Sequence, residues 1–149
     1  MTDALDQLAD RLDTLPLAVN QAVVGIVERF GLLLLTLNRD YLQKQGERPD
    51  GQPLQARGYS PAYASYKKKY GTFTNTAFVD LKFSGDFLAS FRITYTGSLQ
   101  FTIDATDKKA GFLAKYGALL GLREEDVQTF VTATLEPEVR AFISQHLNQ

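Results

Sequence analysis

The sequence contains no cysteine and only one histidine, His146. Without cysteine, disulfide bonds, thiolate metal sites and cysteine nucleophiles are excluded together. A single histidine cannot supply the familiar serine triads or the usual zinc ligand sets, and its position near the C-terminus suits the dipole of a final helix. Neither the P-loop nor the dinucleotide-binding glycine motif follows a predicted strand. The sequence therefore predicts a protein that is not an enzyme and that uses no metal or cofactor.

An excess of charge of one sign is also missing. Sixteen lysines and arginines stand against seventeen aspartates and glutamates, which gives a formal net charge of -1. This balance argues against a protein that binds nucleic acid over most of its surface, although a local basic patch stays open. Hydrophobic residues make up 44% and charged residues 22%. With a length of 149 residues, this composition predicts one compact domain over 1–149.

Long hydrophobic runs are absent as well. The most apolar stretch, at 32–35, is flanked by charged residues and falls far short of the roughly 20 residues that a spanning helix needs. The N-terminus carries Asp3 and Asp6, where a secretory signal would carry basic residues. We therefore expect neither a membrane span nor export by that route, and a cytosolic location is the simplest interpretation.

Helical periodicity dominates the first third of the chain. An apolar stripe with steps of three and four residues comprises Leu5, Leu8, Leu12 and Leu15. Pro16 interrupts it and predicts the start of a second, longer helix that runs to about Gln45 and stops at Gly46. The apolar arc of this helix around 32–35 is wider than one contact surface requires, so we expect the helix to be central or packed on two sides.

Turn-forming residues crowd the segment 47–58, which predicts an exposed loop. Ser60 and Pro61 then predict a capped helix that runs through Lys69 and is ended by Gly71. Further along, helical signals return at 108–116 and from Glu124 onward, and Pro137 is expected to break or kink the last helix.

Ser84, Gly85 and Asp86 predict a tight entrance to a single helical turn. After this structural turn the apolar period changes to two. The alternating runs at 91–95 and 99–103, joined by 96–98, predict a β-hairpin with one buried face, and 78–83 is a weaker candidate strand beside it. The predicted fold class is α+β, with a long N-terminal helix packed on a small antiparallel sheet with a central hairpin, and a helical C-terminus.

One cluster of basic and aromatic residues could contact a partner or DNA, and it comprises Arg57, Tyr59, Tyr63, Lys67, Lys68 and Lys69. Three interpretations are open for its lysines: a solvated helix end, a contact with an acidic protein partner, or a grip on nucleic acid. Three aspartates, Asp6, Asp10 and Asp13, also recur at helical spacing. They are typical of a solvated helix face, with a carboxylate metal site as the rival interpretation.

Two segments resemble small morphogenesis proteins of tailed bacteriophages and prophages. The first is Asp50-Gly51-Gln52-Pro53-Leu54, followed by Tyr59-Ser60-Pro61-Ala62-Tyr63-Ala64 and by Tyr66-Lys67-Lys68-Lys69. The second runs from Val79 to Phe91 and is similar to the segment that precedes a β-hairpin in those proteins. Lys115-Tyr116-Gly117 and the segment 121–126 also fit, except that Arg123 stands where a capping serine or threonine is expected.

The resemblance implies a structural subunit of a phage or phage-derived particle, of the neck or tail-completion type. Such proteins act as ring-forming subunits that join head and tail around the DNA channel. The implied partners are copies of the same chain, other virion proteins such as connector or tail subunits, and DNA in the channel. The implied location is the virion, and the host cytoplasm during assembly. A nucleic-acid-binding accessory protein that uses 67–69 is the alternative function.

Overall fold

The computed structural model describes residues 4–55, 57–97 and 99–149. Ala56 of the predicted loop and Ser98 of the predicted hairpin turn lie outside the described residues. The chain divides into two compact units: unit 1 comprises the described residues of 1–30, 95–100 and 124–149, and unit 2 comprises those of 31–94 and 101–123. The predicted α+β class is confirmed, with a long N-terminal helix, a two-stranded antiparallel sheet and a helical C-terminus. The single domain over 1–149 stays a prediction.

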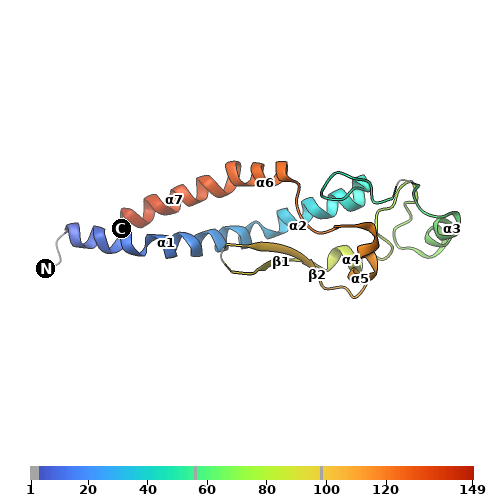
Figure 1. Ribbon diagram of the computed structural model, residues 1–149, viewed down its shortest axis with the longest axis horizontal. Coiled ribbons are helices and arrows are strands. Elements are labelled where there is room, and N and C mark those ends of the chain that lie inside the picture. The colour runs from blue at the N-terminus through green and yellow to red at the C-terminus, as the bar shows by residue number, and fades with distance from the viewer. Residues whose placement is uncertain (1–3, 56, 98) are drawn as a thin grey trace. The chain divides into compact units, whose positions relative to one another are not determined.

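Unit 1 is built from two helical segments that run side by side in opposite directions (Figure 1). Its elements are α1 (Ala4–Arg29), α6 (Glu124–Phe130), the π-helical turn η3 (Val131–Leu135) and α7 (Glu136–Leu147). The Arg11 side chain donates to the backbone oxygen of Leu147 at 3.2 Å, which ties the first half of α1 to the end of α7. At the opposite end, the rings of Phe30 and Phe130 meet edge to face with centroids 6.1 Å apart.

The expected helix start at Pro16 is wrong. Pro16 lies inside α1, which continues to Arg29. Proline removes one backbone donor and leaves the carbonyl of the preceding turn without it, but Pro16 is exposed, so water can satisfy that carbonyl. The helix ends instead at Arg29, Phe30 forms a turn, and α2 begins at Gly31.

The predicted irregularity at Pro137 takes the form of a wider helical turn. The amide of Glu136 donates to the carbonyl of Val131, five residues back, immediately before the proline. Since proline cannot donate a hydrogen bond to the preceding turn, a π-helical turn here accommodates it without ending the segment. α7 carries His146 in its last turn, where the imidazole stacks on the ring of Phe142 with centroids 5.8 Å apart.

Very little of unit 1 is buried. Among its described residues, only Ile26 and Val27 have less than a tenth of their surface in solvent. The predicted leucine stripe along α1 is largely exposed instead, with Leu5 at 71% and Leu12 at 49%. The two helical segments of unit 1 therefore leave a substantial apolar surface in solvent.

Unit 2 holds the hydrophobic core. Its elements are α2 (Gly31–Asp40), the π-helical turn η1 (Tyr41–Gln45), α3 (Pro61–Tyr70), α4 (Asp86–Ala89), all but the last residue of β1 (Phe91–Tyr95), β2 (Phe101–Ala105), α5 (Ala110–Leu113) and the 3-10 turn η2 (Ala114–Tyr116). The buried cluster comprises Leu42, Leu54, Val79, Phe87, Leu88, Phe91 and Leu119. Leu32 and Leu33 of the apolar arc remain 71% and 49% exposed, while Leu34 is buried.

Asn38 is a fully buried polar residue in this core. Its side-chain nitrogen donates to the carbonyl of Leu119 at 2.9 Å, and its side-chain oxygen accepts from the amide of Gly121 at 3.1 Å. Asn38 thus ties α2 to the segment after η2. Gly46 ends the helical segment as predicted, because its φ of 66° is left-handed and a Cβ there would lie 2.5 Å from the ring of Phe78.

The predicted hairpin is confirmed, with a shift in its second strand. β2 begins at Phe101, because Leu99 has a φ of 57° and belongs to the connection, which the amide of Gln100 closes by donating to the carbonyl of Gly97 at 2.9 Å. The candidate strand at 78–83 is wrong. This segment joins no sheet in the described structure, since Leu81 has a φ of 55° and Asp80 turns its side chain to a buried partner.

The predicted loop at 47–58 is exposed at its tip and anchored at two points in unit 2. The tip at 50–53 is in solvent, and Glu47 pairs with Pro53 as an isolated bridge. Leu54, in contrast, is 6% exposed and belongs to the core, and Glu47 forms an ion pair with Arg123 at 2.7 Å. Arg123, which stands where a capping serine or threonine was expected, thus holds the base of this loop through its ion pair with Glu47.

Candidate functional site

The helix α3 places its three lysines in different surroundings. Ser60 caps the helix by accepting from the amide of Tyr63 at 3.3 Å, and Pro61 occupies the first helical position. Because successive residues on a helix are about 100° apart, three consecutive side chains cannot share one face. Lys67 points into unit 2 and is wholly buried, whereas Lys68 and Lys69 are exposed.

Asp80 is the buried partner of Lys67. The ammonium of Lys67 lies 2.5 Å from the Oδ1 atom of Asp80, and the side chains are 0% and 3% exposed. The same oxygen accepts from the hydroxyl of Tyr59 at 2.8 Å and from the amide of Lys82 at 3.1 Å. The second oxygen of Asp80 accepts from the side chain of Asn75 at 3.2 Å. A buried carboxylate with this many donors is satisfied by its surroundings, which offsets the cost of removing both charges from water.

Tyr59 links this ion pair to the surface. Its hydroxyl accepts from the amide of Asp80 at 3.1 Å, and the Lys67 ammonium lies 4.7 Å from the centroid of its ring. Burial, together with the neighbouring carboxylate, raises the pKa of Tyr59 far above the ordinary tyrosine value of 10.0. The hydroxyl therefore stays protonated and fixes the ring in one orientation.

The predicted contact cluster is not one surface. Tyr59 and Lys67 are joined in the buried network, and Tyr63 lies next to Tyr59 with ring centroids 5.0 Å apart. Arg57, Lys68 and Lys69 are exposed. The expectation that all three lysines face outward is wrong for Lys67, because its ammonium is buried against Asp80. Asp80 lies in the irregular segment 78–83, which the sequence suggested was a strand.

Tyrosine rings form a continuous row along α3. Tyr63 and Tyr66 are 6.5 Å apart between centroids, Tyr66 and Tyr70 are 4.9 Å apart, and Tyr66 stacks on Phe83 at 5.7 Å with an angle of 16° between the ring planes. Tyr63 and Tyr66 of this row, with Tyr59 and Phe83, make one wall of a pocket of about 620 Å³ that lies within unit 2. Burial also raises the pKa of Tyr63.

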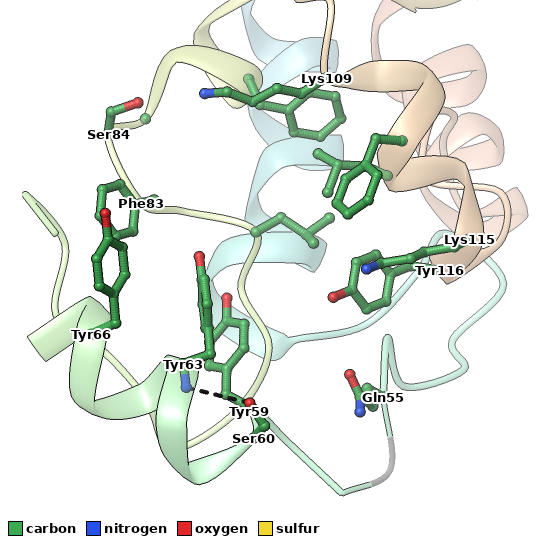
Figure 2. Close-up of a pocket in the computed structure, with 15 residues that line it drawn as sticks. Gln55, Tyr59, Ser60, Tyr63, Tyr66, Phe83, Ser84, Lys109, Lys115 and Tyr116 are labelled. Atoms are coloured by element: carbon green, nitrogen blue, oxygen red, sulfur yellow. Dashed lines mark hydrogen bonds between the residues drawn. The ribbon is translucent and has the colours of Figure 1, made fainter.

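The opposite wall of the pocket comes from α5 and η2 (Figure 2). Phe112, Leu113, Lys115 and Tyr116 line this side, and Lys109 lines the pocket from just before α5. Figure 2 shows Tyr59, Tyr63 and Tyr66 on one side, with Lys115 and Tyr116 facing them across the space. Leu81 and Phe87 complete the lining with apolar surface.

The predicted turn at 84–86 is confirmed and borders the pocket. Gly85 has a φ of 94°, and the hydroxyl of Ser84 donates to the carboxylate of Asp86 at 2.7 Å before α4 begins. A Cβ at Gly85 would lie 3.0 Å from the ring of Phe73, so both backbone geometry and space favour glycine. Ser84 and Gly85 line the pocket, which gives this turn a place in the site.

Several residues of the site had no signal in the sequence analysis. Asp80 had no charge pattern that linked it to Lys67, and Lys109, Lys115 and Tyr116 lie about 50 residues beyond the tyrosine row. Only the cluster Lys115-Tyr116-Gly117 had been noted, for its resemblance. Aromatic residues next to lysines on both segments, at 59–70 and 109–116, are the pattern that could have suggested the pocket.

Comparisons of the chain with protein-family models, with curated proteins and with solved structures found no match. Among the described residues, no group of three or more histidine, cysteine, aspartate or glutamate side chains is placed to hold a metal ion. No single helix in the described parts of the chain is long and apolar enough to cross a bilayer, although α1 taken together with α2 and η1 meets the length and composition requirement.

Proposed function

We propose that the protein is a structural subunit of a phage or phage-derived particle, of the neck or tail-completion type, and that copies assemble into a ring. In this role it joins head and tail by contacts with copies of itself and with other virion proteins. It is made in the host cytoplasm and becomes part of the virion. The tie to virion proteins comes from the segments at 50–69 and 79–91 that resemble phage morphogenesis proteins.

The observation that carries the assembly role is the missing core of unit 1. Among the described residues of that unit only Ile26 and Val27 are buried, while Leu5, Leu8 and Leu12 are 71%, 39% and 49% exposed. Apolar surface of this kind, continuous along one helix, is typical of a protein interface. A partner that covered it would supply the core that unit 1 lacks.

A second copy of the chain is the partner that this surface fits. Leu5, Leu8, Leu12 and Leu15 follow the alternating steps of three and four residues that form the seam between paired helices. An apolar seam of this kind is self-complementary, as a contact between identical subunits requires. The net charge of -1 gives copies little electrostatic reason to repel one another.

Sedimentation velocity of variants tests the assembly role. Replacing Leu5 and Leu12 by glutamine is expected to shift the protein from assembly to monomer, because it puts polar groups into the seam. The matched control replaces the same leucines by methionine, which keeps the seam apolar and is expected to keep the assembly. Equal sedimentation of the wild type and both variants would contradict the proposal.

The virion role has a separate test in purified particles. Mass spectrometry of phage particles from the strain that encodes the chain is expected to detect it alongside the other virion proteins. Its absence from complete particles would contradict the virion role and leave the assembly role standing. The alternative function at 67–69 has lost one of its three lysines, because Lys67 is buried against Asp80. We therefore do not propose that cluster as a nucleic-acid contact.

A further inference from the structure

The pocket of unit 2 has aromatic walls and a cationic rim. Tyr63 and Tyr66 present their rings from α3, and Phe112 and Tyr116 come from α5 and η2. Among the described residues that line it, the charged side chains are both lysines, and none is an aspartate or glutamate. This combination favours a ligand with a flat, apolar body and a negative charge.

The two lysines are available to such a ligand. In the described part of the chain, no hydrogen bond or ion pair engages the ammonium of Lys109. The ammonium of Lys115 contacts only rings there, at 4.1 Å from the centroid of Phe112 and 5.1 Å from that of Tyr116. Figure 2 shows Lys109 near Ser84 at one end of the pocket and Lys115 beside Tyr116. An anion at either lysine would gain charge-assisted hydrogen bonds without breaking an existing ion pair.

The aromatic wall of α3 is held in place before any ligand arrives. Tyr66 is stacked on Phe83, and the hydroxyl of Tyr59 is fixed by Asp80, which is itself held by Lys67. A wall that is already ordered loses little conformational freedom on binding. The buried ion pair thus has a role in the site: it positions the ring of Tyr59, although neither charge reaches the pocket.

The pocket size fits a small molecule. Its volume of about 620 Å³ lies inside the range of roughly 300–1,000 Å³ that is usual for small-molecule sites. The polar lining groups, which include Gln55 and Ser60, are few, as expected for groups that orient a ligand. Aromatic rings stack on every nucleobase, and lysines bind phosphate.

We propose that this pocket binds a nucleotide, with its base stacked against the tyrosine wall and its phosphate held by one of the two lysines at its rim, Lys109 or Lys115. The nucleotide can be free in solution or can be one unit of a single strand, since both present the same base and phosphate. The site lies within unit 2, so the proposal is independent of the assembly surface of unit 1.

Isothermal titration calorimetry with four probes tests the proposal: adenosine 5′-monophosphate, adenosine, inorganic phosphate and an oligodeoxyadenylate of about ten nucleotides. Saturable binding of the monophosphate is expected, with adenosine and phosphate each weaker by about tenfold or more, because each lacks one half of the ligand. Tighter binding of the oligonucleotide would identify a single strand as the source. Equal or tighter binding of the monophosphate would identify the free nucleotide.

Variants separate this site from unspecific charge. Replacing Lys109 and Lys115 by glutamine is expected to weaken monophosphate binding by about tenfold or more and to leave adenosine binding unchanged. Lys108→Gln is the matched control, since Lys108 is exposed beside Lys109 but does not line the pocket. No saturable binding of either nucleotide probe, equal binding of adenosine and the monophosphate, or equal effects of the double variant and the control would overturn the proposal. Neither variant is expected to change sedimentation, so failure here is distinct from failure of the assembly role.

Discussion

Lys67 and Lys68 are adjacent on one helix, but the same substitution should greatly reduce stability at Lys67 and hardly change it at Lys68. Lys67 is 0% exposed and 2.5 Å from Asp80, while Lys68 lies in solvent. Lys67→Gln leaves the Asp80 carboxylate buried without its counter-charge, and breaking a buried ion pair in this way costs about 3–5 kcal/mol. Three hydrogen bonds from Tyr59, Lys82 and Asn75 still reach that carboxylate, so we expect the lower end of this range.

Urea unfolding followed by tyrosine fluorescence measures this change in stability in unit 2, where Lys67 lies. The chain has no tryptophan, and all of its tyrosines except Tyr95 lie in unit 2. Lys67→Gln is expected to lower the free energy of unfolding by about 3 kcal/mol, and Lys68→Gln to change it by less than about 0.5 kcal/mol. If the two variants have the same stability within 0.5 kcal/mol, roughly the limit for surface substitutions, Lys67 is not a buried partner of Asp80.

A double variant distinguishes the loss of the pair from the loss of packing. Replacing Lys67 by methionine and Asp80 by leucine removes both charges, so neither is left buried alone. The double variant is expected to be more stable than the sum of the two single changes predicts, because residues in contact do not act additively. Simple additivity would show that the two charges do not interact.

Three further predictions concern unit 2. Gly85→Val is expected to cost about 1–3 kcal/mol of stability, because φ at Gly85 is 94° and a Cβ there would stand only 3.0 Å from the ring of Phe73. Gly111→Ala, in open space, should have little effect in the same urea assay. The pKa of Tyr59 is raised in the folded state, so above about pH 10 the unfolded state has lost a proton that the folded state still holds. The free energy of unfolding should therefore fall there as pH rises, by at most about 1.4 kcal/mol per pH unit. Tyr59→Phe should flatten this dependence in urea titrations at several pH values, and an unchanged slope would refute it. Asn38→Ala should cost about 2 kcal/mol, since it leaves the buried carbonyl of Leu119 without its donor, and a calorimetric melting temperature equal to that of the wild type would contradict this.

Local rules predicted the parts of the fold that local chemistry controls. The cap at Ser60, the helix end at Gly46 and the turn at Gly85 follow from side-chain capping and from left-handed backbone that glycine tolerates. The first hairpin strand also has its predicted bounds, because alternation at 91–95 is a local pattern.

The misses have tertiary causes. Pro16 stays inside a helix because that stretch is exposed and water reaches the freed carbonyl, which the sequence alone does not reveal. Lys67 looked like one of three surface lysines, because the carboxylate that draws it inward lies 13 residues away in an irregular segment. Aromatic residues beside lysines at 59–70 and 109–116 could have suggested a site, but not a shared pocket, since the pocket exists only where unit 2 brings 59–66 against 109–116. No local period links those two segments.

The mass of the native assembly tests the central claim that the chain is a ring-forming structural subunit. Native mass spectrometry of the full chain, across a range of concentrations, should show one dominant assembly of two or more chains, at an integral multiple of the 16.6 kDa chain mass. The variant with glutamine at Leu5 and Leu12 should dissociate to the single chain mass under the same conditions. A wild-type protein that stays at 16.6 kDa at every concentration would contradict the account.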